Sequence, residues 1–251
     1  MIALRIDRLT LAYDGAPVID GLDLDIKPGE LFVIAGASGC GKSTLLRALA
    51  GLLAPRAGTI LADGAPVRGP SPDRALVFQD DALLPWRTTQ RNVELPLAIR
   101  GVGRTERRAR ARNWLARVGL SGQERRLPGQ LSGGMRQRVQ LARTLAGAPQ
   151  AVFMDEPFGA LDAQTRAAMQ RLLIDVLAAA PATVVFVTHD VDEALLLGDR
   201  VAVLTPRGVA DVVDVPYPRD PTARGTAEVA AARTRVLAAL TAEPCSAHPS
   251  S

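Results

Sequence analysis

Residues 36–44, with the sequence GASGCGKST, carry the clearest chemistry in the chain. They fit the pattern G-x-x-x-x-G-K-[ST], in which glycines let the backbone wrap closely around phosphate groups. In such a loop Lys42 reaches the β- and γ-phosphates of a nucleotide, and the hydroxyl of Ser43 binds Mg²⁺. We therefore predict a phosphate-binding loop made of Gly36, Ala37, Ser38, Gly39, Cys40, Gly41, Lys42, Ser43 and Thr44.

Further polar groups follow apolar runs that have the character of buried strands. Gln79 ends ALVFQ, His189 follows TVVFVT, and Asp155 and Glu156 end AVFMDE. The carboxyl ends of parallel strands meet at one edge of a sheet, so we expect these side chains beside the phosphate loop. Asp155 would hold Mg²⁺, and Gln79 would touch the metal or the attacking water. Glu156 would act as a general base on that water, and His189 would contact the γ-phosphate.

Each of these groups also has an ordinary structural interpretation. Polar residues commonly end strands, an acidic pair can simply solvate a loop, and a single histidine is more often a packing or surface residue. The catalytic interpretation is favoured because a phosphate loop accompanies them in the same sequence.

A second stretch with anion-binding character is LSGGMRQR at 131–138. Ser132, Gly133 and Gly134 stand at the expected start of a helix, where unpaired N–H groups and the helix dipole attract anions. The phosphate loop at 36–44 already holds one nucleotide, so this second stretch is expected to serve a different one.

The hydrophobic pattern predicts the elements that position these residues. Alternation predicts short, half-exposed strands in IALRID, LTLAY and LDLDI, forming an antiparallel layer. Continuous apolar runs predict further strands at 31–36, 59–64, 75–79, 151–157, 183–190 and 200–205. Helices are expected at 42–53, 163–179, 191–197 and 226–241. Strands that alternate with helices are typical of a parallel α/β sheet.

Residues 82–147 differ from the rest of the chain. This segment is rich in arginine and shows helical spacing near 91–100, 105–118 and 133–146. It is therefore expected to be an inserted helical subdomain.

Composition excludes several classes of protein. The chain has 251 residues, a net charge of +4 and only two cysteines, Cys40 and Cys245, so it is no disulfide scaffold. Charged residues interrupt the first ten residues, where a signal peptide needs an apolar core. The apolar region 172–187 contains Asp175 and Pro181 and falls short of the roughly 20 residues that span a bilayer. We expect a soluble or peripheral protein.

The order of these motifs resembles the ATP-binding subunit of ABC transporters. The phosphate loop, Gln79, LSGG, Asp155–Glu156, GALD at 159–162 and His189 follow the family's order, over the chain up to about residue 205. The resemblance implies an α/β P-loop ABC-type ATPase with a mostly parallel central sheet, an N-terminal antiparallel β layer and an inserted helical subdomain. It implies ATP and Mg²⁺ as cofactors. The ATPase domain would span 1–205, and 206–251 would be a short extension without a separate regulatory domain.

In this family two ATPase subunits pack head to tail, and each ATP lies between the phosphate loop of one and LSGG of the other. The resemblance therefore implies a second ATPase subunit, in a homodimer or with a close homologue. The residues that would meet the partner's ATP are Ser132, Gly133, Gly134 and Gln137. Asp162 resembles the residue that communicates across the interface. Tyr13 resembles the aromatic that stacks on adenine, although it could be an ordinary core or surface tyrosine.

Two segments resemble one importer group. QDDALLPW at 79–86 and DEPFGALDAQTR at 155–166 are similar to ATPases of nitrate, sulfonate and taurine importers. This likeness implies two transmembrane permease subunits that contact Gln79–Trp86, an extracytoplasmic substrate-binding protein, and a peripheral position on the cytoplasmic face of the inner membrane. The apolar LLPW could instead belong to a local core of the helical subdomain.

Other functions remain as alternatives. The chain could serve a different ABC system, such as thiamine-precursor uptake or an exporter. A DNA-repair ABC ATPase is the least favoured, because it would need a long coiled coil or cysteine pairs. The basic run RTERRARAR at 104–112 lies on a predicted helix, where charges are usually solvated, so nucleic acid is not an expected partner.

Overall fold

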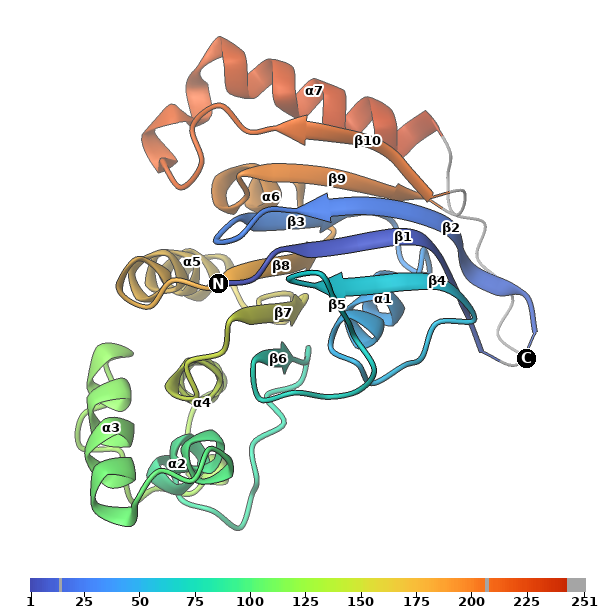
Figure 1. Ribbon diagram of the computed structural model, residues 1–251. Coiled ribbons are helices and arrows are strands. Elements are labelled where there is room, and N and C mark those ends of the chain that lie inside the picture. The colour runs from blue at the N-terminus through green and yellow to red at the C-terminus, as the bar shows by residue number, and fades with distance from the viewer. Residues whose placement is uncertain (14, 206–207, 243–251) are drawn as a thin grey trace.

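A six-stranded sheet lies at the centre of the computed structural model, which describes residues 1–13, 15–205 and 208–242. The strand order is β10-β9-β3-β8-β7-β6 (Figure 1). The parallel strands are β3 (Leu31–Ala35), β6 (Arg74–Val77), β7 (Ala151–Asp155), β8 (Thr183–Thr188) and β9 (Arg200–Thr205). Both faces of this sheet are covered, which explains the continuous apolar runs of its central strands. Its carboxyl ends form the edge on which the predicted site residues lie.

The N-terminal layer is an antiparallel sheet with the order β2-β1-β4-β5. Its strands are β1 (Leu4–Ala12), β2 (Pro17–Ile26), β4 (Ala57–Ala62) and β5 (Ala65–Pro66). The two strands predicted in IALRID and LTLAY are one strand, β1, whose register is irregular between Asp7 and Thr10. Arg8, with φ of 45°, makes the bend that interrupted the alternation in the sequence. Helix α1 (Lys42–Leu49) contacts both sheets and shares a hydrophobic core with them.

A helical lobe stands beside the central sheet (Figure 1). It contains α2 (Thr89–Ile99), α3 (Arg104–Arg117), the 3₁₀ turn η1 (Pro128–Gln130) and α4 (Gly133–Ala146). These elements occur between β6 and β7 in the sequence, where an inserted helical subdomain is expected. The buried faces of the lobe belong to the same hydrophobic core as one face of the central sheet, so the lobe is firmly packed.

The remaining helices cover the sheet. They are α5 (Ala163–Ala179), α6 (Val191–Leu197), the 3₁₀ turn η2 (Pro221–Gly225) and α7 (Ala227–Ala242). The sequence did not reveal β10 (Gly208–Asp214), which pairs with β9 in antiparallel fashion. The sheet therefore continues beyond the predicted boundary at residue 205. The second cysteine, Cys245, lies outside the residues that the structure describes.

No helix within residues 1–13, 15–205 and 208–242 has the length and apolar character needed to cross a membrane.

Candidate nucleotide site

The phosphate loop connects β3 to α1, as its sequence predicts. β3 ends at Ala35 and α1 begins at Lys42. Gly39 and Gly41 have φ angles of 85° and 89°, a left-handed conformation that is readily accessible only to glycine. Successive N–H groups in such a turn form a concave surface that can bind an anion.

Close packing fixes this loop at its first glycine and at its lysine. A methyl group on Gly36 would lie 2.6 Å from the carbonyl oxygen of Leu204, so the loop tolerates no side chain there. The ammonium group of Lys42 donates to the carbonyl oxygens of Gly36 and Ala37, each at 2.8 Å. The side chain of Cys40 is buried in the core. The loop thus holds the Lys42 ammonium at its centre.

Residues predicted from separate stretches of the sequence line one cavity of about 400 Å³. They are Tyr13, Ser38, Gly39, Gly41, Lys42, Ser43, Thr44, Gln79, Asp155 and Glu156. They meet because β3, β6 and β7 end at the same edge of the central sheet (Figure 1). One detail differs from the prediction, since β6 ends at Val77 and Gln79 lies in the loop beyond it rather than at the strand end. The loop leaves Gln79 exposed toward the cavity.

Glu156 joins the phosphate loop to the end of β8. Its carboxylate lies 3.0 Å from Nδ1 of His189 and 4.0 Å from the ammonium group of Lys42. The backbone of Glu156 has φ of 42°, an unfavourable value for a residue with a side chain. Its N–H group donates to the carbonyl oxygen of Val187 at 3.0 Å, which helps to hold that conformation. Strain of this kind is commonly found at functional sites.

Tyr13 lies at the rim of the cavity and is 52% exposed. Its hydroxyl oxygen accepts a hydrogen bond from Arg47 of α1 at 3.3 Å. The hydroxyl of Thr44 lowers the pKa of the Tyr13 phenol, and Arg47 lowers it further, against the opposing effect of burial. The ring is therefore tethered beside the phosphate loop and remains about half exposed at the cavity.

The LSGG stretch lies at a second hollow, of about 600 Å³. Ser132 caps α4, and its hydroxyl oxygen accepts from the N–H group of Met135 at 3.3 Å. Gly133, Gly134 and Asp162 line the same hollow. None of its lining residues belongs to the cavity at the phosphate loop. Within one chain, the two stretches predicted to bind anions therefore open onto different spaces.

Gln137 lines neither of these two spaces. Its side-chain amide donates to the carbonyl oxygen of Pro157 at 3.0 Å, which ties α4 to the segment after β7. It is half-buried and does not line the hollow that contains Ser132.

Sequence reasoning missed a group of residues on α4 that hold the loop around Gln79. The buried amide of Gln140 donates to the carbonyl oxygens of Phe78 and Asp80, both at 3.0 Å. Arg136 forms an ion pair with Asp81 at 2.7 Å. Arg143 donates to the carbonyl oxygen of Ala82 at 2.8 Å. Their spacing on one face of a helix was the available signal, but the sequence does not say which loop lies opposite.

Glu193 is the second feature that sequence reasoning missed. Its buried carboxylate accepts hydrogen bonds from Gln170 of α5 at 2.9 Å and from Thr188 of β8 at 2.7 Å. Burial raises the pKa of Glu193, although these two hydrogen bonds act in the opposite direction. The carboxylate thus connects α5 to Thr188, the residue directly before His189. Asp162 caps the start of the same helix.

Comparison with known proteins agrees with this geometry. The family model described as ABC transporter matches residues 19–159. A Brucella abortus protein named only for ATP binding is 46% identical over 241 residues, which cover 94% of this chain and 93% of that protein. The taurine import ATP-binding protein TauB of Chromobacterium violaceum is 49% identical over 208 residues, which cover 82% of this chain and 80% of TauB.

A solved structure shares the fold. The dimeric ATP-binding cassette MJ0796, in a post-hydrolysis state bound to ADP and Pi, superposes with a TM-score of 0.75 at 32% sequence identity. The match covers 85% of this chain and 99% of the other. The predicted α/β P-loop fold, ATP binding and ATP hydrolysis are confirmed, and the chain belongs to the ABC transporter family as an ATP-binding, ATP-hydrolysing subunit.

Proposed function

We propose that this chain is the energy-coupling ATPase of a bacterial importer for a small anion such as a sulfonate, taurine or nitrate. The likeness to TauB, 49% identical over 82% of the chain, supports import and this class of substrate. The transported molecule itself is chosen by other subunits, which would be two membrane permeases and an extracytoplasmic substrate-binding protein. ATP binding closes a pair of ATPase subunits, and hydrolysis reopens it.

Mg²⁺ would accompany ATP in the cavity at the phosphate loop. Ser43, Gln79 and Asp155 offer a hydroxyl, an amide and a carboxylate oxygen, and this hard donor set suits Mg²⁺. Among the residues that the structure describes, no cluster of three or more His, Cys, Asp or Glu could hold a metal alone. A few protein oxygens together with phosphate oxygens are the usual ligands of Mg²⁺ in such sites. When bound, the ion would neutralise charge on the phosphates.

Glu156 would act as the general base of hydrolysis. Its position between Lys42 and His189 supports this role, because both neighbours orient the carboxylate toward the cavity. Lys42 would bind the β- and γ-phosphates, and His189 would contact the γ-phosphate. The loop that carries Gln79 would detect the γ-phosphate or the attacking water.

A second copy of the chain, or a close homologue, would complete the nucleotide site. The observation that carries this proposal is the separation of the two anion-binding stretches into different spaces of one chain. In a head-to-tail dimer, the helix start at Ser132, Gly133 and Gly134 would face the ATP held by the partner. The N–H groups and dipole of α4 would then stabilise the γ-phosphate. Asp162, in the same hollow, would contact the partner across the interface.

The surface Gln79–Trp86 would transmit closure to a membrane subunit, which keeps the protein on the cytoplasmic face of the inner membrane. Within the apolar LLPW stretch, Leu83 is buried and Leu84 is half-buried, so these two leucines contribute to a local core. Trp86 is 73% exposed and is available to a partner. Exposed tryptophan is typical of the anchor residues of protein interfaces.

Light scattering with ATP and Mg²⁺ tests the proposed function. Glu156→Gln should bind ATP but hydrolyse it at least about 100-fold more slowly, so that the closed dimer accumulates. Adding Ser132→Arg should abolish the dimer while ATP binding persists, because the arginine blocks only the second stretch. The parent chain provides the control for turnover. A Glu156→Gln chain that binds ATP and stays monomeric would contradict dimer closure by the isolated ATPase.

A further inference from the structure

A cavity of about 350 Å³ lies where α6, the 3₁₀ turn η2 and the first two turns of α7 meet. We call it the α6–α7 pocket. Its volume is in the range of small-molecule sites, which is about 300–1,000 Å³. It shares no lining residue with the nucleotide cavity or with the hollow at Ser132. The α6–α7 pocket is therefore separate from the site of ATP hydrolysis.

One part of the α6–α7 pocket is apolar. Leu195 and Leu196 of α6 belong to the hydrophobic core and also line the pocket. Val229 of α7 is half-buried, and Tyr217, in the loop before η2, is 44% exposed. Aliphatic and aromatic side chains of this kind favour a ligand that has an aliphatic group of its own, because such a group leaves water when it binds.

Charged side chains of both signs line the same pocket. Asp192 and Arg233 neutralise each other through an ion pair of 2.9 Å. Asp220 and Arg224 form no ion pair within the described part of the chain, either with each other or with another residue. Two opposite charges that line one pocket without meeting leave separate places for an ammonium group and for an anionic group.

The turn η2 fixes the position of these two unpaired charges. The carboxylate of Asp220 caps the turn and accepts hydrogen bonds from the N–H group of Thr222 at 2.8 Å and from its hydroxyl at 2.6 Å. These hydrogen bonds lower the pKa of Asp220, so its carboxyl is ionised at neutral pH. Arg224 follows four residues later, in the same turn, and donates no side-chain hydrogen bond within the described residues.

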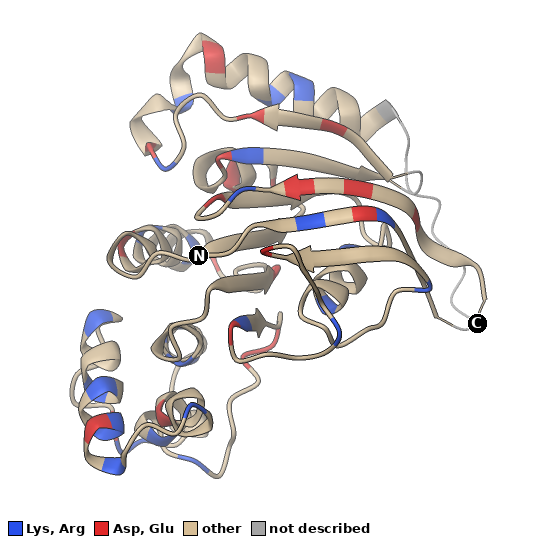
Figure 2. Ribbon diagram, in the orientation of Figure 1, with Lys and Arg blue, Asp and Glu red and all other residues tan. Residues whose placement is uncertain are grey.

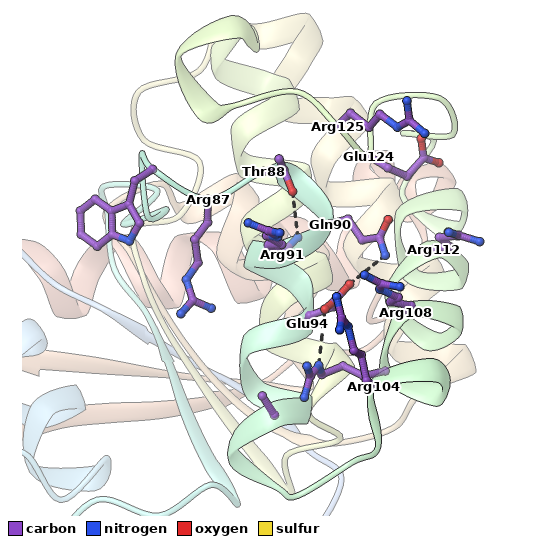
Figure 3. Close-up of a pocket in the computed structure, with 13 residues that line it drawn as sticks. Arg87, Thr88, Gln90, Arg91, Glu94, Arg104, Arg108, Arg112, Glu124 and Arg125 are labelled. Carbon is purple, nitrogen blue, oxygen red and sulfur yellow. Dashed lines mark hydrogen bonds and ion pairs between the residues drawn. The ribbon is translucent and has the colours of Figure 1, made fainter.

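A larger cleft, of about 1000 Å³, lies between α2 and α3 and has a different balance of charge (Figure 3). Arginines of both helices line it, together with Glu94 and Glu124. Figure 2 shows that basic residues prevail along α3, whereas α7 carries both signs. Trp86 also lines this cleft, which therefore belongs to the surface already proposed to contact a membrane subunit. The α6–α7 pocket, with two aspartates and two arginines, favours a ligand without net charge.

We propose that the α6–α7 pocket binds a small zwitterion with an aliphatic side chain, which is the chemistry of an apolar amino acid such as leucine. The ligand's carboxylate would meet the guanidinium group of Arg224, and its ammonium group would meet Asp220. Its side chain would pack on Leu195 and Leu196. A simple anion would leave Asp220 without a partner and would be repelled by it, and a simple cation would stand in the same relation to Arg224.

A series of ligands tests the proposal on the parent chain by ligand-observed NMR titration. Leucine carries all the groups that the pocket would recognise. The compound 4-methylpentanoate lacks the ammonium group, 3-methylbutylamine lacks the carboxylate, and glycine lacks the aliphatic side chain. Leucine should bind saturably with a Kd of about 1 mM or below, which is attainable for a ligand of its size. Each of the other compounds should bind at least tenfold more weakly.

A charge-matched pair of double variants locates the binding. Asp220→Asn with Arg224→Gln removes one charge of each sign and should weaken leucine binding at least tenfold. The asparagine can still accept from the N–H group of Thr222, so η2 keeps its cap. Arg171→Gln with Asp175→Asn removes the same charges, also four residues apart, from exposed positions of α5 outside the pocket, and should leave affinity unchanged. Circular dichroism confirms that each variant is folded.

The ligand series on the parent chain keeps the proposal open to refutation even if a variant fails to fold. Leucine that shows no saturable binding up to about 20 mM would overturn it. Equal binding of leucine and 4-methylpentanoate would show a site for carboxylates alone and would also overturn it. Full affinity for leucine in a folded Asp220→Asn/Arg224→Gln chain would place the ligand elsewhere, and the proposal would be wrong.

Discussion

At the scale of single residues, Glu156 and Glu193 show how environment gives two acidic residues different roles. Glu156 has a strained backbone and a carboxylate held between Lys42 and His189, at the cavity edge. Glu193 is buried, and its carboxylate accepts hydrogen bonds from Gln170 and Thr188. It does not line the cavity. The first carboxylate can act on a ligand. The second positions the chain that ends in His189.

Glu193→Gln should change how stability depends on pH. Burial raises the pKa of Glu193 above its ordinary value of 4.5, so the folded chain retains this proton to higher pH than the unfolded chain. The free energy of unfolding of the parent therefore falls as pH rises above about 4.5, and the variant lacks this contribution. The stability of Glu193→Gln relative to the parent should rise over that interval, as measured by urea unfolding at several pH values.

Glu124→Gln provides the control, because hydrogen bonds from the backbone N–H groups of Glu124 and Gly122 lower the pKa of that carboxyl. The ionised Glu124 stabilises the folded chain above its lowered pKa, and this contribution is lost as pH falls. Relative to the parent, Glu124→Gln should therefore lose stability as pH rises toward about 4.5. Parallel curves for Glu193→Gln and the parent would show that Glu193 ionises as it does in the unfolded chain.

At the scale of elements, α4 joins the LSGG stretch to the loop around Gln79. Its first turn carries Ser132 and the glycines, and its later turns hold Phe78, Asp80 and Ala82 through hydrogen bonds. Helix α4 therefore connects the proposed contact with the partner's ATP to the loop that is proposed to contact the membrane subunit.

Gln140→Met should loosen that connection. Methionine keeps the length of the side chain but cannot donate to the carbonyl oxygens of Phe78 and Asp80, so both acceptors lose their partner. We expect a loss of about 1–3 kcal/mol in the free energy of unfolding, together with slower ATP hydrolysis. Urea unfolding and phosphate release measure the two effects.

Gln150→Met is the matched control for this change, because the Gln150 side chain makes no hydrogen bond within the described structure. Its stability and turnover should stay close to those of the parent. If Gln140→Met behaved in the same way, α4 would not be what holds the loop around Gln79.

At the scale of the whole molecule, residues 208–242 pack against the central sheet. β10 extends the central sheet, and α7 packs against β9, β10 and α6 (Figure 1). Val236 of α7 is fully buried in the core that the helical lobe also shares. Among residues 208–242, β10 and α7 therefore share the hydrophobic core of the domain predicted to end at residue 205.

Val236→Ala and Leu237→Ala test this integration. Val236 is 0% exposed and Leu237 is 36% exposed, although they are neighbours on α7. Removing the buried methyl groups of Val236 should cost about 2 kcal/mol and lower Tm by several degrees. Leu237→Ala should cost less than about 1 kcal/mol. Equal shifts in a thermal scan would mean that α7 is not part of the cooperative core.

The sequence alone determined the elements whose pattern is local. The apolar runs predicted β3, β8 and β9, the helical spacing predicted α5 and α6, and the glycine pattern predicted the phosphate loop. In each case the signal lies within a short window, either as periodicity or as residues with a special backbone conformation. The strand β10 was not predicted, because its own sequence has no clear strand pattern. Its pairing with β9 is what stabilises it.

Only the tertiary structure decided which distant residues meet. It joined Glu193 to Gln170, placed Gln140 against the loop of Gln79, and brought arginines of α2 and α3 to one cleft. It also showed that the two stretches predicted to bind anions open onto different spaces of one chain. Motifs that bind phosphate are visible in sequence because their chemistry requires particular residues at fixed spacing. Contacts between elements depend on packing across the whole fold, which no local pattern encodes.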